Sequence, residues 1–146
     1  MISSFSRNFL VDSCFWIALF DMRDESHSLA GELEDVVFSQ RVLVPFPCLY
    51  EFLGTRFSRR PLVIEEIDRI FIRSKVELIP DELYRNSIIE RYITSSRTGR
   101  TLSAVDLIIN AMLEDINLRV HGLITFNVAD FAPMCRKRSI QLISGV

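Results

Sequence analysis

The chain has 146 residues, of which 49% are hydrophobic and 25% are charged, and its formal net charge is −2. This composition excludes a disordered chain, and the length suits one domain over residues 1–146. The small net charge argues against a protein that coats nucleic acid by charge alone. The longest uninterrupted apolar run, Cys14 to Phe20, is far shorter than the roughly 18 residues of a membrane span, so no membrane contact is expected.

Short apolar runs alternate with helix-like stretches along the chain. The predicted strands cover residues 8–12, 42–44, 76–79, 120–125 and 140–143. The predicted helices cover residues 13–22, a stretch that includes 29–37, 48–57, 62–74, a long helix that Asp81 caps, 103–117, and a short helix or turn over 127–136. Strands that alternate with helices call for a parallel sheet covered on both faces, so the predicted fold class is α/β.

Two of these helices carry apolar stripes that predict how they pack. In the helix capped by Asp81, the stripe is Tyr84, Ile88, Ile89 and Tyr92. In the helix over 103–117, the stripe is Val105, Ile108, Ile109, Met112 and Ile116. Between these two helices, residues 95–101 are predicted to form a polar loop, with Gly99 as a stop signal for the preceding helix.

The three cysteines, Cys14, Cys48 and Cys135, are an odd number without metal-ligand spacing. Each lies among apolar residues, so we expect reduced, buried thiols in a cytoplasmic protein. The spacing of these cysteines argues against a zinc site.

Three acidic residues interrupt otherwise apolar segments. Asp12 ends the first predicted strand, Glu51 lies in an almost entirely apolar helix start, and Asp106 lies in the first turn of the helix that Ser103 caps. Such strand-to-helix junctions share one edge of a parallel sheet, so the three carboxylates are expected to converge there. Each acid taken alone also fits a helix cap or dipole partner, except that Glu51 lies farther from its helix start.

Converging carboxylates repel one another unless cations neutralise them. Oxygen ligands of this kind suit Mg²⁺ or Mn²⁺. Two such ions could activate a water and stabilise the leaving oxygen of a phosphodiester. A fourth candidate pair, Asn127 and Asp130, follows the predicted strand that includes Thr125.

The ordered combination of these segments resembles the PIN-domain nucleases and, among them, the small VapC-type toxins of type II toxin–antitoxin pairs. The matching segments are Val11-Asp12-Ser13, Tyr50-Glu51-Phe52-Leu53, the stretch from Leu102 to Ile109, and the stretch from Thr125 to Phe131. The resemblance implies a PIN-like α/β/α sandwich with a central parallel sheet of four to five strands. It also implies an endoribonuclease that hydrolyses RNA phosphodiesters with Mg²⁺ or Mn²⁺.

The resemblance further implies the roles of individual residues. By matching position, the catalytic and metal-binding residues are Asp12, Glu51, Asp106 and Asp130. The supporting residues are Ser13, Ser103, Thr125 and Asn127. Asn127 stands where a version of the family motif has an acid two residues after the threonine, so Asp130 would act through water or not at all.

RNA contacts are assigned to Arg97 and Arg100, in the polar loop before Ser103, because arginine suits bidentate phosphate contacts. The expected partners are an RNA substrate, a small antitoxin protein and a second copy of the chain. Surplus apolar residues, including 11 Phe, provide surface for such protein contacts.

Two other functions compete with the ribonuclease. One is a catalytically degenerate PIN-like module that binds RNA or protein, which Asn127 suggests and which would bind without cleaving. The other is a phosphate-transferring enzyme with Asp12 as nucleophile. That function is disfavoured because Cys14, not an aspartate, lies two residues after Asp12, and no lysine follows a later strand at a suitable place.

Overall fold

The computed structural model describes residues 7–145. Within these residues a sheet of five strands forms the centre: β1 (Asn8–Val11), β2 (Arg41–Pro45), β3 (Glu77–Ile79), β4 (Gly122–Ile124) and β5 (Gln141–Ile143). The strand order is β3-β2-β1-β4-β5, and each adjacent pair is parallel. The predicted parallel sheet is confirmed. A single domain over 1–146 stays a prediction, since residues 1–6 and 146 lie outside the described residues.

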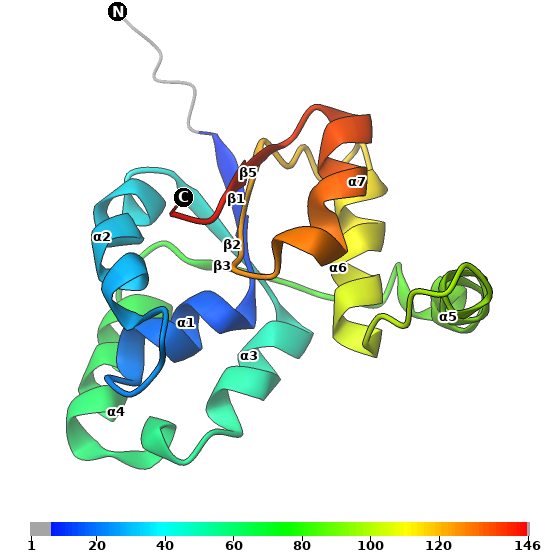
Figure 1. Ribbon diagram of the computed structural model, residues 1–146. Coiled ribbons are helices and arrows are strands. Elements are labelled where there is room, and N and C mark those ends of the chain that lie inside the picture. The colour runs from blue at the N-terminus through cyan, green and yellow to red at the C-terminus, as the bar shows by residue number, and fades with distance from the viewer. Residues whose placement is uncertain (1–6, 146) are drawn as a thin grey trace, which may run out of the picture.

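Helices cover both faces of this sheet. They are α1 (Ser13–Phe20), α2 (His27–Phe38), α3 (Phe46–Leu53), α4 (Pro61–Ile67), α5 (Ile88–Arg97), α6 (Ala104–Glu114) and α7 (Val128–Arg138). Figure 1 shows α1 to α4 on one side of the sheet, α6 and α7 on the other, and α5 outermost beyond α6. Over residues 7–145, no helix combines the length and apolar character needed to span a membrane.

The central strand is the most deeply buried part of the sheet. Phe9, Leu10 and Val11 on β1 are at most 2% exposed, as expected for a strand with helices on both faces. On one side of the sheet the core contains Trp16, whose ring lies 5.2 Å from that of Phe15 and 5.0 Å from that of Phe71.

The order of the strands places a topological switch point at β1. The chain runs from β1 to β2 on one side and later enters β4 on the other side of β1. Ligands bind at the carboxyl ends of parallel strands where the connections diverge in this way. Residues that directly follow β1, β2 and β4 therefore lie near one another at the carboxyl edge of the sheet.

The prediction of a long helix capped by Asp81 is wrong. A 3₁₀ turn, Arg85–Ser87, comes first, and α5 begins only at Ile88. The Asp81 carboxylate instead pairs with Arg85 at 3.0 Å, so it does not cap a helix. The stripe on α5 is also not buried, because Ile89 is 69% and Tyr92 48% exposed.

Other helix ends differ from the prediction for local reasons. Helix α3 ends at Leu53 rather than at residue 57. Just after this end, the hydroxyl of Thr55 donates a hydrogen bond to the Phe52 carbonyl at 2.6 Å. Helix α6 ends at Glu114, and Ile116 lies outside the core with 63% exposure. The predicted helix over 62–74 divides into α4 and a π-helical turn, Asp68–Ile72. Helix α5 continues through residues assigned to the polar loop, and α7 is a full helix.

Candidate metal centre

Asp12 is a buried carboxylate at the carboxyl end of the central strand. It is 3% exposed and caps α1 from an extended backbone conformation. Its Oδ1 accepts a hydrogen bond from the Ser13 N–H at 2.7 Å, and its Oδ2 accepts one from the Thr125 hydroxyl at 2.9 Å. Burial raises the pKa of Asp12 above its ordinary value, and the hydrogen bonds from Thr125, Cys14 and Ser13 offset this only in part.

Glu51 reaches the same place from α3, which begins directly after β2. Pro47 lies in the first turn of that helix, where a missing N–H is tolerated. The Glu51 side chain is exposed, and its Oε1 accepts a hydrogen bond from the Ser13 hydroxyl at 2.7 Å. The same hydroxyl oxygen lies 3.4 Å from Asp12 Oδ1. Ser13 therefore links the two carboxylates.

Asp106 lies in the first turn of α6, and it is not among the residues whose ligand atoms lie within 4.8 Å of one another, which are Asp12, Cys48 and Glu51. Ser103 caps this helix, as predicted, and its hydroxyl accepts from the Asp106 N–H at 3.1 Å. Partial burial raises the pKa of Asp106 to about 6, and the negative charges of Asp12 and Asp130 add to this increase. Burial is thus the main cause of the raised pKa of Asp106, and repulsion by the other carboxylates is a smaller one.

Asp130 lies in the first turn of α7, next to the loop before α6. Its Oδ1 is 3.3 Å from the Arg100 guanidinium, which also donates to the Ala129 carbonyl. Asn110 on α6 donates to the main-chain carbonyls of Asp106 at 3.0 Å and Asp130 at 3.3 Å. These contacts fix the spacing between α6 and α7, and so between the two acids.

The remaining predicted residues lie as follows. The Asn127 side chain is exposed and makes no capping hydrogen bond, while its N–H donates to the Thr125 hydroxyl at 3.0 Å. Arg97 is exposed in the last turn of α5, not in the polar loop where it was expected. Arg100 lies in that loop and is already paired with Asp130. The roles of these residues stay predictions.

Two thiols that were not predicted as site residues lie beside Asp12. Cys14 Sγ is 3.4 Å from Asp12 Oδ2, and Cys48 Sγ is 3.8 Å from Asp12 Oδ1. Potential ligand atoms of Asp12, Cys48 and Glu51 all lie within 4.8 Å of one another. One signal was available, since Cys48 and Glu51 are three residues apart and so share one face of a helix. Cys14, Cys48 and Cys135 are free thiols, as expected, but only Cys48 and Cys135 are buried, because Cys14 is partly exposed.

The acidic cluster, by which we mean Asp12, Glu51 and Asp106, lacks basic partners among the described residues. Within residues 7–145, no ion pair involves Asp12, Glu51 or Asp106. Asp12 is instead held by neutral donors, which leave its charge in place. The carboxylate oxygens are ligands that suit Mg²⁺ or Mn²⁺. These residues therefore fit a divalent cation, which would remove the repulsion.

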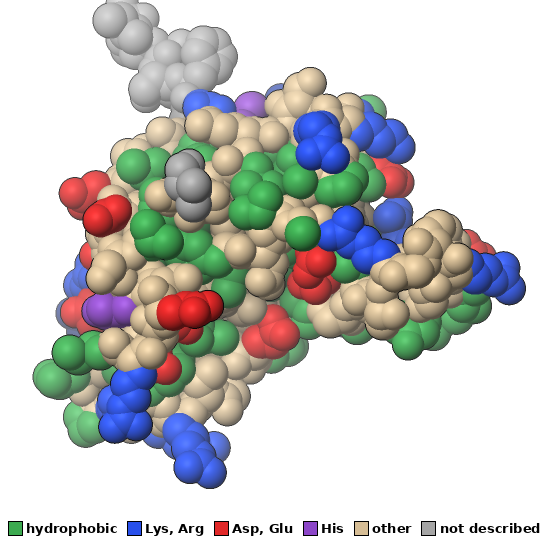
Figure 2. Space-filling model, in the orientation of Figure 1, with side chains coloured by type: hydrophobic (Ala, Val, Ile, Leu, Met, Phe, Trp, Pro, Cys, Tyr) green, Lys and Arg blue, Asp and Glu red, His purple; other side chains and the backbone are tan. Residues whose placement is uncertain are grey.

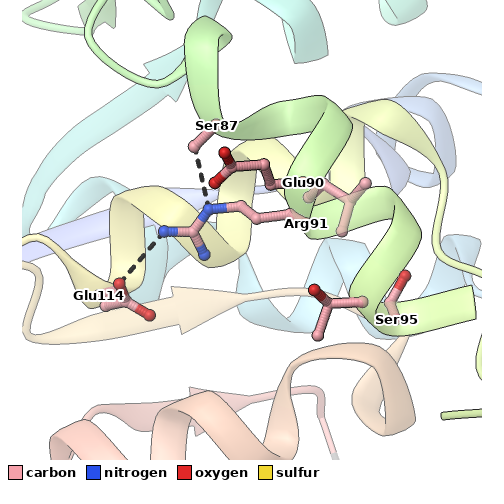
Figure 3. Close-up of a pocket in the computed structure, with 7 residues that line it drawn as sticks. Ser87, Glu90, Arg91, Ser95 and Glu114 are labelled. Carbon is pink, nitrogen blue, oxygen red and sulfur yellow. Dashed lines mark hydrogen bonds and ion pairs between the residues drawn. The ribbon is translucent and has the colours of Figure 1, made fainter. Parts of the chain in front are cut away.

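Acidic and basic side chains are mixed on the surface. Figure 2 shows acidic side chains both near the centre and at the edges of one face, and basic side chains mostly toward its edges. A separate hollow of about 460 Å³ lies between α5 and α6. There Arg91 donates to Ser87 and to Glu114, both at 3.1 Å, and Glu90 lies alongside (Figure 3). Since two carboxylates accompany one guanidinium, this hollow does not favour an anion.

The sequence matches no protein-family model and no curated protein. The fold is similar to that of solved structures. One is VapC20 of Mycobacterium tuberculosis, a sarcin–ricin loop cleaving toxin, with 20% identity and a TM-score of 0.62 over 86% of this chain and 94% of that chain. Another is VapBC2 of Rickettsia felis bound to a DNA fragment from the promoter, with 14% identity and a TM-score of 0.61 over 93% and 97%.

A third similar structure is FitAcB of Neisseria gonorrhoeae, with 12% identity and a TM-score of 0.58 over 94% of this chain and 97% of that chain. The three matches cover nearly the whole chain at low identity. They confirm the expected resemblance to the PIN fold, including its parallel sheet.

Proposed function

We propose, from the premise that this chain has the PIN fold seen in VapC and FitB toxins, that it is a Mg²⁺- or Mn²⁺-dependent endoribonuclease. The observation that carries the proposal is the buried Asp12 carboxylate, which no basic residue within 7–145 neutralises and which has a ligand oxygen of Glu51 within 4.8 Å. VapC20 is described as cleaving the sarcin–ricin loop, which supports RNA as the substrate class. An RNA substrate also implies a cytoplasmic location.

Each acidic residue would have a distinct part in this activity. Asp12, Glu51 and Asp106 would hold the cation, with Asp130 completing the cluster from α7. A bound Mg²⁺ or Mn²⁺ would supply Lewis-acid catalysis and an activated water. Thr125 keeps the second oxygen of Asp12 in place, and Ser13 orients Glu51. We assign phosphate contacts to Arg97, in the last turn of α5, and to Arg100, in the following loop beside Asp130.

Cleavage of mixed RNA substrates under a divalent-metal titration tests the proposal. Asp12→Ala should lower the cleavage rate by about 100-fold or more, since loss of a mere supporting partner of a ligand costs about 10–100-fold. The matched control is Asp35→Ala, which removes an exposed aspartate on α2. Equal cleavage by the Asp12 variant and the wild type would refute the assignment.

The degenerate module remains the competing function, because Asn127 supplies no carboxylate to the cluster. It predicts that the folded protein binds RNA and leaves it uncut at every Mg²⁺ and Mn²⁺ concentration. The metal titration therefore separates the two functions directly.

A toxin would also need an antitoxin. The names VapBC2 and FitAcB describe assemblies with a second component, and we extend that arrangement to this chain. Expression of the wild type alone should then arrest bacterial growth, whereas Asp12→Ala should not. Growth that continues at matched expression of the wild type would contradict the toxin role.

The predicted homodimer has a candidate surface at α5. Ile88 and Ile89, together with Tyr50 and Val105, line an apolar hollow of about 500 Å³ between α3, α5 and α6. The hollow also contains one acid and one base, Asp81 and Arg85, which pair at 3.0 Å. Because a two-fold contact places a surface against itself, such a charge-balanced apolar surface suits a second copy of the chain.

Sedimentation tests this dimer. Ile89→Asp should convert the dimer to a monomer, because it would bury a charge in the contact. The matched control is Ile72→Asp, which changes an exposed isoleucine on the π-helical turn. A wild type that sediments as a monomer, or an Ile89 variant that stays dimeric, would reject the surface.

A further inference from the structure

The acidic cluster of this chain contains a ligand that hard cations do not need. Cys48 is completely buried on α3, one helical turn before Glu51. Its Sγ lies 3.8 Å from Asp12 Oδ1, and the ligand atoms of Asp12, Cys48 and Glu51 are within 4.8 Å of one another. Mg²⁺ takes oxygen ligands, so a thiol at this distance contributes nothing to a magnesium site.

The separation of sulfur and oxygen matches a different metal. In tetrahedral zinc sites the Zn–S distance is about 2.3 Å and the Zn–O distance about 2.1 Å, which together place sulfur about 3.6 Å from oxygen. Cys48 Sγ donates a hydrogen bond to Asp12 Oδ1 at 3.8 Å, so the two atoms are already about as far apart as two ligands of one such ion would be. Glu51 is exposed and lies at the surface of the cluster, so rotation of its side chain can bring the third ligand inward.

We propose that Asp12, Cys48 and Glu51 form a binding site for a thiophilic divalent cation of the Zn²⁺ and Cd²⁺ class. On binding, an S–metal bond replaces the S–H bond of Cys48, and the proton leaves to solvent. A water takes the fourth, open position. Because the site shares Asp12 and Glu51 with the proposed magnesium site, the thiophilic cation excludes the hard cation. The inference rests on the proposed function only in this shared use of the two carboxylates.

Cadmium provides a direct test, because its thiolate complexes have a charge-transfer band in the ultraviolet. One equivalent of Cd²⁺ added to the full metal-free chain should produce this band. Cys48→Ala should abolish the band or weaken Cd²⁺ binding by at least about tenfold, the scale of loss for altered metal sites. Cys135→Ala removes the other fully buried thiol, on α7, and should bind Cd²⁺ as the wild type does.

Several results would overturn the site. They are no band in the wild type, an unchanged band in Cys48→Ala, or a band that disappears in Cys14→Ala while persisting in Cys48→Ala. If circular dichroism shows that Cys48→Ala is unfolded, Glu51→Gln decides, because it changes an exposed side chain. That variant should bind Cd²⁺ at least about tenfold more weakly, and unchanged affinity rejects the site.

Cleavage assays separate this inference from the proposed function. A cadmium band without any Mn²⁺-dependent RNA cleavage would refute the ribonuclease and leave the thiophilic site standing. Cleavage with Mn²⁺ but no cadmium band would refute the thiophilic site and leave the ribonuclease standing. If both hold, one equivalent of Zn²⁺ should inhibit wild-type cleavage and have a weaker effect on any cleavage by Cys48→Ala.

Discussion

Asp106→Asn should make the metal-free protein more stable at neutral pH. The folded state raises the pKa of this carboxyl from an ordinary 3.8 to about 6 because of burial and the charges of Asp12 and Asp130. At about 1.4 kcal/mol per pH unit, that difference corresponds to about 3 kcal/mol. Asp106 is only half-buried, so solvent screening reduces the figure to about 1–2 kcal/mol. The asparagine removes this cost and keeps the shape of the side chain.

The effect has a defined dependence on pH. Below the unfolded-state pKa the carboxyl is protonated in both states, and its charge costs nothing. As pH rises from about 4 to about 6, the unfolded chain releases the proton first, so wild-type stability falls through this window. Above the folded-state pKa of about 6 the cost is complete and constant. The variant should lack this particular decline.

Thermal unfolding in EDTA between pH 4 and pH 8 measures the difference. At pH 7.5 the melting temperature of Asp106→Asn should exceed that of the wild type by about 3–6 °C, and near pH 4 the two should agree. Added Mn²⁺ should then raise the wild-type value more than that of the variant. A variant that is less stable at pH 7.5, or a difference independent of pH, would refute the reasoning.

Three other outcomes are expected. Thr125→Val should lower the free energy of unfolding by about 2–3 kcal/mol in urea, because it removes one donor to Asp12 and one acceptor for the Asn127 N–H; an unchanged midpoint would contradict this. Arg97→Ala should reduce the salt slope of RNA binding by about 1, and an unchanged slope would reject the phosphate contact. The Cys14 thiol, whose pKa burial raises from 9.0 to about 12, should react with iodoacetamide about 1000-fold more slowly in the native than in the unfolded protein; equal rates by mass spectrometry would count against this environment.

The sheet could be predicted from the sequence because strands buried on both faces have no polar positions. Leu10 and Val44 show this, since both are completely buried. Helix ends were less predictable, because single local contacts set them. The hydroxyl of Thr55 bonds back at the end of α3, and Arg85 takes the Asp81 carboxylate that was expected to cap a helix. The apolar stripe of α5 predicted a helix correctly but not which way it faces.

The acidic residues could be identified because a charged side chain within an apolar segment must be paired or bind a cation. Cys48 could not, because a cysteine in an apolar segment is already explained by packing. Its place next to Asp12 depends on how α3 lies against α1, which periodicity does not report. Arg97 was predicted in the polar loop, but it lies in α5, because this helix extends further than the polar composition of its last turn indicates.

The hydrogen bond between Asp12 and Thr125 joins positions that are 113 residues apart in the chain. During translation Asp12 and Glu51 emerge early, whereas β4 and α7, which bring Thr125 and Asp130, emerge much later. A growing chain that ends before β4 therefore carries an incomplete acidic cluster on an incomplete sheet. For a protein proposed to cut RNA, this order of synthesis delays completion of the site until β4 and α7 have been made.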